Sequence, residues 1–162
     1  MMTLIGDVMT TNWYKEIKED ATKVNEALEY YNSQYLEAKA ELKDNGKHLQ
    51  QVQLELPSLF EIRYSQLQEL EAIIEFFDIK VKGLRSNLYQ KLLSNSQRAL
   101  TSNDVKQYID GDKNIMELQL IINDIALVRN KFISITKSLD IKNWQLSNVT
   151  KSLCAGINDV IL

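Results

Sequence analysis

Apolar side chains recur along this chain at alternating steps of three and four residues, in three separate stretches. The stretches cover residues 17–42, 67–88 and 121–139. Because an α-helix turns once in about 3.6 residues, this spacing places the apolar side chains of each stretch on one helical face. The same spacing is typical of the heptads in coiled coils and long bundle helices. The sequence therefore predicts three long amphipathic helices.

The first two predicted helices are separated by turn-forming residues. An N-terminal helix is predicted over residues 11–56, with an interruption at Asp44-Asn45-Gly46. The pattern leaves open whether residues 49–56 continue this helix or form a short second one. Pro57 suits the first position of a new helix, where its missing N–H would have no intrahelical partner. We predict that this central helix runs to about residue 93 and is followed by a polar loop to residue 103.

The last third of the chain begins with a recognisable helix start. Thr101 and Asp104 have the spacing of a capping box, which predicts a short helix ending near Ile109. Asp110-Gly111-Asp112 then predicts a turn. A helix is predicted over residues 113–139, followed by a final short element, and no sheet is expected beyond at most a short extended piece around residues 144–146.

These elements define an all-α protein, a long helical hairpin or bundle with coiled-coil-like seams. We expect one domain over residues 1–162, made of an acidic N-terminal helix (11–56), a basic central helix and loop (57–103) and C-terminal helices (104–162). Three long stripes and an apolar C-terminus exceed what one small chain readily hides, which favours a homo-oligomer. The alternative is that all three stripes face one another within the monomer.

Composition supports helix over sheet and a reducing compartment. One proline and five glycines are too few for the many turns of a β fold. The single cysteine, Cys154, cannot form an internal disulfide, which fits the cytoplasm. Residues 1–11 lack the basic and apolar pattern of a leader, and no apolar run is long enough to span a membrane. We expect no membrane association.

Residues suited to catalysis are sparse. The one histidine, His48, has no second histidine or cysteine cluster with which to bind a metal. The phosphate-binding glycine loops and the nucleophile elbow are absent, and neighbouring acids such as Asp110 and Asp112 suit solvated turns. The sequence therefore predicts a binding protein, not an enzyme, and no cofactor.

Charge is strongly segregated along the chain. Residues 1–78 hold 7 Lys and Arg against 15 Asp and Glu, a net charge of −8. Residues 79–103 hold five bases and no acid. The five bases are Lys80, Lys82, Arg85, Lys91 and Arg98. On a helix, Lys80 and Lys91 lie on one flank of the apolar stripe, and Lys82 and Arg85 lie on the other.

Two partners could neutralise this basic segment. Phosphates of single-stranded DNA would give affinity without sequence specificity, and Tyr89 could then stack on a base, although buried packing is the favoured interpretation for Tyr89. Alternatively, the basic segment pairs with the acidic first half, inside the chain or between subunits. Charge alone does not separate the two hypotheses.

Several landmarks in the second half resemble the UvsY family of phage recombination mediators. They are Ile79-Lys80-Val81-Lys82, Val105-Lys106, Asp112-Lys113 followed by Ile115, and Lys142-Asn143-Trp144-Gln145-Leu146. The resemblance covers about residues 79–149. The family has Arg where this chain has Lys82, and Gly-Phe where it has Asn143-Trp144. A lysine keeps the charge but loses the bidentate fork of arginine.

The resemblance implies a ring-shaped homo-oligomer that binds single-stranded DNA through the basic segment. It also implies that the protein helps to load a RecA-like recombinase onto strands covered by single-strand-binding protein. ATP would belong to the recombinase. The main alternative is a helical phage structural or assembly protein that acts only through protein–protein contacts.

Overall fold

The computed structural model describes residues 12–43, 46–95 and 101–156, and its described elements are all helical. They are α1 (Trp13–Glu19), a 3₁₀ turn η1 (Ala21–Lys23), α2 (Val24–Glu41), α3 (Leu49–Asn95), α4 (Ser102–Asp110) and α5 (Lys113–Cys154). The all-α prediction is confirmed for this part of the chain.

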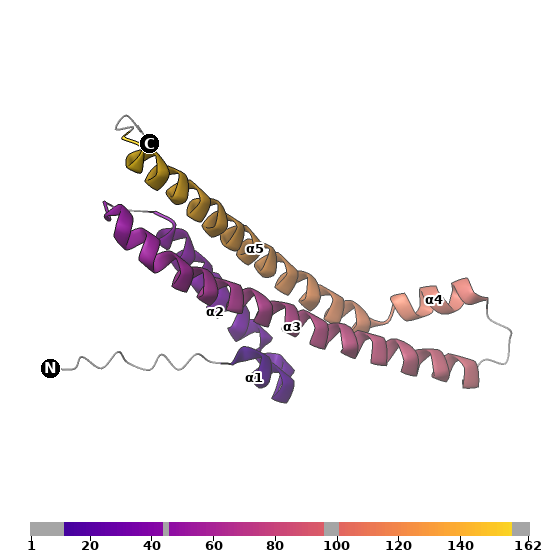
Figure 1. The fold of residues 1–162 in the computed structure, drawn as a ribbon. Coiled ribbons are helices and arrows are strands. Elements are labelled where there is room, and N and C mark those ends of the chain that lie inside the picture. Colours follow the sequence, from indigo (N-terminus) through magenta and orange to yellow (C-terminus); the bar gives the residue numbers. More distant parts are fainter. Residues whose placement is uncertain (1–11, 44–45, 96–100, 157–162) are drawn as a thin grey trace.

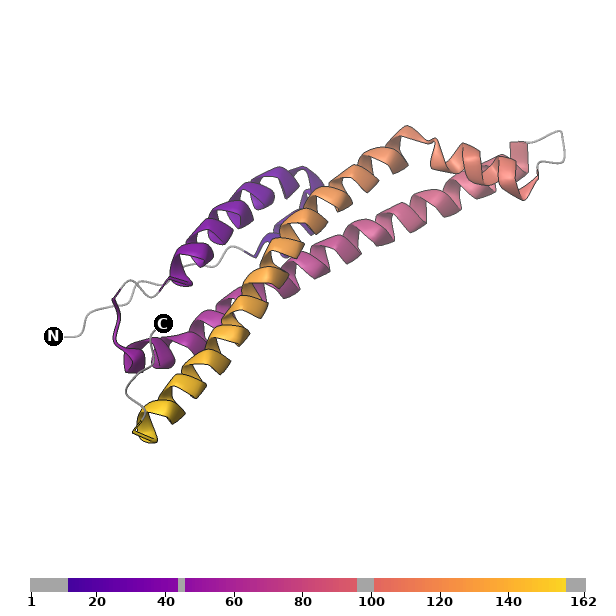
Figure 2. The same ribbon diagram turned by 90° about the horizontal axis from the view of Figure 1, so that it is seen from above.

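Two long antiparallel helices, α3 and α5, form the frame of the molecule (Figure 1). Helices α1 and α2 lie beside one half of this pair, and α4 lies beside the last turns of α3 (Figure 2). Phe77 of α3 and Phe132 of α5 are completely buried in the main core, and Tyr31 of α2 packs edge-on against Phe132. The three predicted stripes therefore meet inside the chain, as the monomer alternative expects.

Two polar contacts attach the N-terminal helices to α3. The Glu69 carboxylate accepts hydrogen bonds from the Tyr14 backbone N–H at 2.9 Å and from the Tyr31 hydroxyl at 2.6 Å. Burial, and then the Glu69 carboxylate, raise the pKa of Tyr31, so that this phenol stays a hydrogen-bond donor. Arg63, only 2% exposed, donates to both carboxylate oxygens of Glu41, at 2.7 and 3.0 Å. Acids of the first half thus stabilise its own packing.

The predicted helix over residues 11–56 is wrong at Asp20, where α1 ends and the backbone leaves the helical conformation. Asp20 adopts an extended backbone and caps the next turn, because its side chain accepts from the Thr22 N–H at 3.0 Å and the Thr22 hydroxyl at 2.7 Å. Such side-chain bonds compete with the helical ladder. The predicted interruption after α2 is confirmed, and Gly46 adopts the left-handed φ of 74° there. Asp44 and Asn45 lie outside the described residues.

The prediction that Pro57 begins a helix is wrong, because Pro57 lies inside α3. Its ring removes the hydrogen bond to the Gln53 carbonyl, which is a local cost. Packing on both sides of the proline offsets that cost. Leu56 is buried against Leu139 of α5, and Leu59 packs against the same small cluster. Residues 49–56 are therefore the first turns of α3 and not part of the preceding helix.

The predicted end of the third helix, near residue 139, is also wrong. Helix α5 continues to Cys154, and residues 144–146, where the prediction allowed a short extended piece, are helical. No proline or glycine interrupts residues 140–154, and Leu146 packs against the cluster around Leu139. The short helix α4 agrees with its prediction, including the capping box of Thr101 and Asp104.

Candidate nucleic-acid interface

Three of the five predicted DNA-binding residues have exposed, positively charged side chains. Lys80, Lys82 and Lys91 are exposed on the last turns of α3. Among the described residues, none of the three forms an ion pair with a carboxylate. Lys80 lies over the Phe76 ring at 4.6 Å, which holds its stem along the helix while its charge stays in water. Arg98 lies outside the described residues.

Arg85, the fourth described base, is already engaged. Its guanidinium forms an ion pair with Asp110 at the end of α4, at 2.7 Å. Both side chains are about two-fifths exposed, at 41% and 42%. The pair connects α3 to α4 and lowers the positive charge that Arg85 can offer to a phosphate.

The acidic first half does not neutralise the basic segment within the described chain. Helices α1 and α2 lie beside the other half of the α3–α5 pair, away from the end that carries α4 (Figures 1 and 2). Their acids have local partners, such as Lys23 for Glu16 and Arg63 for Glu41. Inside one chain, the pairing hypothesis therefore has no contact to support it.

Two tyrosines near the basic segment are exposed. Tyr89 on α3 is 48% exposed, so the favoured prediction that it is buried is wrong. It lies on the flank of Lys82 and Arg85, beside the apolar stripe of α3. Tyr108 on α4 is 65% exposed, and the sequence pattern had not singled it out. No spacing pattern singles it out, because Tyr108 stands three residues after buried Val105, and that spacing also fits an inward position.

Two side-chain caps define where α4 and α5 begin. The Asp104 carboxylate accepts from the Thr101 hydroxyl at 2.6 Å, and these hydrogen bonds hold the pKa of Asp104 below its usual value. Asp112 then caps α5 by accepting from the backbone N–H groups of Asn114 at 3.0 Å and Ile115 at 3.2 Å. The predicted turn at residues 110–112 is confirmed, and it sets the direction in which α5 returns along α3.

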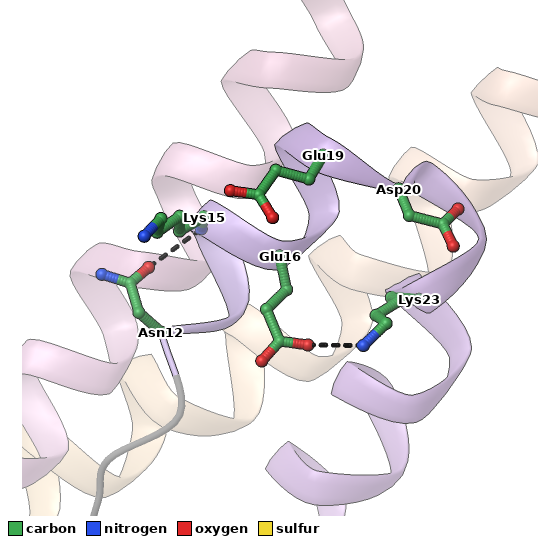
Figure 3. A pocket seen from close by; sticks show the side chains of 6 residues that line it. All are labelled: Asn12, Lys15, Glu16, Glu19, Asp20 and Lys23. Atoms are coloured by element: carbon green, nitrogen blue, oxygen red, sulfur yellow. Dashed lines mark hydrogen bonds and ion pairs between the residues drawn. The ribbon is translucent and has the colours of Figure 1, made fainter.

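A polar hollow lies elsewhere, around α1 and η1, and has a volume of about 460 Å³ (Figure 3). Its charged groups serve the local fold. Glu16 pairs with Lys23 at 2.8 Å, and Asp20 caps the turn at Thr22. The Thr22 hydrogen bonds lower the pKa of Asp20, and the Glu16 hydrogen bond raises that of Lys23. The hollow is lined by both acidic and basic side chains, and their contacts do not indicate a catalytic or binding site.

Residues suited to metal binding or nucleophilic chemistry do not gather in the described chain. No group of three or more His, Cys, Asp or Glu side chains there could hold a metal ion. His48 and Cys154 are both exposed, His48 directly before α3 and Cys154 at the end of α5. In the same described part, no helix is long and apolar enough to cross a membrane.

No family model, curated protein or solved structure matches this chain. The open lysines of α3 remain the most distinctive chemical feature of the described surface.

Proposed function

We propose that this protein binds single-stranded DNA as a homo-oligomer and acts as a recombination mediator. The observation that carries the proposal is the set of exposed lysines at the α4 end of α3, namely Lys80, Lys82 and Lys91, which form no ion pair with the described carboxylates. Lysines that remain in water can neutralise phosphates and release counterions, which gives affinity without sequence preference. The resemblance of residues 79–149 to the UvsY family supports the same function.

A second, outward-facing stripe on α5 supports self-association. Met116, Leu120, Leu127, Ile141 and Trp144 are all exposed, with exposed fractions from 48% to 67%. Their heptad spacing places them on the face opposite the buried residues Ile125, Phe132 and Leu139. Burying this stripe between subunits would bring several lysine sets onto one strand, and each later contact would form at high effective concentration.

The proposed role requires no catalysis by this chain and no cofactor. A RecA-like recombinase would supply ATP hydrolysis, and the mediator would weaken the hold of single-strand-binding protein on DNA. These partners, and a location in the cytoplasm of a host cell, follow from the resemblance.

A double change of Lys80 and Lys82 to alanine tests DNA binding. We expect weaker binding of single-stranded DNA in fluorescence anisotropy, with the particle mass unchanged. Each lost phosphate contact should lower the slope of log affinity against log salt by about 0.7. Lys15→Ala with Lys43→Ala removes the same charge from two other exposed lysines and is the matched control. Unchanged binding, or binding lost only together with assembly, would contradict the proposal.

The exposed α5 stripe also fits the alternative of a helical phage structural or assembly protein. In that case the protein would form particles through α5 but show no affinity for single-stranded DNA at physiological salt. Mass and DNA affinity measured on one preparation separate the two functions.

A further inference from the structure

A groove of about 580 Å³ lies between α3 and α5 on the Lys80 flank of the basic segment. Its floor is apolar, formed by the partly buried side chains of Leu84, Leu118 and Ile121. Its rim is polar, with Asn87 on α3 and Asn114 on α5, both exposed. An apolar floor with amide side chains at its rim suits a flat ligand whose edge forms hydrogen bonds.

Gly83 lies at this groove, in the interior of a helix of 47 residues. A glycine in a helix interior is destabilising relative to alanine. No packing inside the chain explains it, because a Cβ at Gly83 would meet no atom within 4 Å, and its φ is not left-handed. A missing side chain at an open groove leaves room for something that approaches the helix from outside.

We infer that this groove holds a nucleobase of the bound single strand, with Lys80 on the neighbouring phosphate. This inference rests on the proposed DNA binding and adds a base-docking site to it. The base face would lie on Leu84, Leu118 and Ile121, and the amides would bond to its edge. Glu117 is the one acid among the lining residues, and it faces Lys113 at 3.7 Å. The charge beside the groove therefore remains positive.

Filling the groove without changing charge tests the inference. Gly83→Leu should lower affinity for single-stranded DNA at least about fivefold, in line with the loss of one base contact. The salt slope should stay at its wild-type value, since no phosphate contact is removed. The thermal midpoint should rise, because leucine favours helix over glycine. Ser86→Leu, at an exposed position of α3 that does not line the groove, is the matched control and should retain wild-type affinity.

A strand with an abasic backbone gives the second measurement, since it keeps the phosphates and lacks the bases. We expect wild-type protein to bind it more weakly than normal DNA, and Gly83→Leu to bind both strands with similar affinity. Equal affinity of Gly83→Leu and wild type for normal DNA would overturn the base site and leave the proposed function standing. A change of particle mass in Gly83→Leu but not in Ser86→Leu would also overturn the base site, because the groove would then be a subunit contact. Absence of DNA binding by the wild type would remove the proposed function itself.

Discussion

The Arg85 guanidinium and the Asp110 carboxylate form an ion pair of 2.7 Å between α3 and α4. Arg85 belongs to the basic segment, and Asp110 begins the turn that leads into α5. Asp110, which lies outside the basic segment, thus neutralises one of the positive charges of that segment. Since both partners are partly exposed, the pair contributes less than about 1 kcal/mol to folding.

Asp110→Asn should therefore strengthen DNA binding. The neutral amide no longer competes with phosphate for Arg85, and an exposed pair of this kind is worth up to about fivefold in affinity. The salt slope should become steeper by up to about 0.7, because Arg85 would then neutralise one more phosphate. Asp140→Asn, an equal charge change at an exposed position of α5, controls for net charge. An equal increase in affinity in both variants would mean that only the overall charge matters.

Arg63 should be the residue most sensitive to change among those that attach α2 to α3. It is buried, and it donates to Glu41, Gln34 and Gln66. Arg63→Met leaves Glu41 without its partner, and we expect a loss of about 2 to 3 kcal/mol in the free energy of unfolding. Because Glu41 is 25% exposed, water can hydrate its carboxylate when the arginine is gone. The expected loss is therefore smaller than for a fully buried ion pair.

Urea unfolding measures this loss. Glu37→Gln is the control, because Glu37 is 57% exposed and lies 3.9 Å from the guanidinium. We expect it to cost less than about 0.5 kcal/mol. Similar losses in both variants would show that general charge, and not the buried Arg63–Glu41 pair, stabilises this contact.

Pro57→Ala should stabilise the protein. Inside a continuous α3, alanine restores the hydrogen bond to the Gln53 carbonyl and removes a ring clash, and we expect a stabilisation of about 1 to 3 kcal/mol. At the first position of a helix, proline is well tolerated and alanine would bring no such stabilisation. Thermal unfolding distinguishes the two positions, and an unchanged or lower midpoint would support the boundary that the sequence predicts.

These helices show which features of the fold are local enough to predict. The capping box at Thr101 involves residues three apart, and the apolar stripes depend on spacing alone, so both could be predicted. Helix continuity through Pro57 depends on Leu139, far along the chain, and was missed for that reason. The break at Asp20 depends on one side-chain conformation, which propensity does not fix.

The candidate site shows the same division. Charge order along the sequence was enough to predict the exposed lysines of α3. The Arg85–Asp110 pair, the exposure of Tyr89 and the groove at Gly83 depend on how α4 and α5 lie against α3. The spacing of residues within one helix does not reveal how the helices pack against one another.

The exposed α5 stripe makes the final prediction. Leu120 and Leu127 are 63% and 64% exposed and occupy the same heptad position, so lysine at both should leave the monomer fold intact. If the stripe joins subunits, the double variant should give a smaller particle in light scattering, because two charges would be buried in each contact. Leu36→Lys, an equally exposed leucine on α2 at 66%, is the control and should keep the wild-type mass.

DNA affinity of the same variants then tests whether assembly serves binding. Loss of multivalency should weaken binding to a long strand by about a hundredfold or more, whereas a strand too short to reach a second subunit should bind about as well as to wild type. Lys80→Ala with Lys82→Ala should instead weaken both strands, because the contact is lost in every subunit. A Leu120→Lys, Leu127→Lys variant that keeps its mass would show that α5 is not the subunit contact. A lighter particle with undiminished affinity for long strands would show that one subunit suffices to bind DNA.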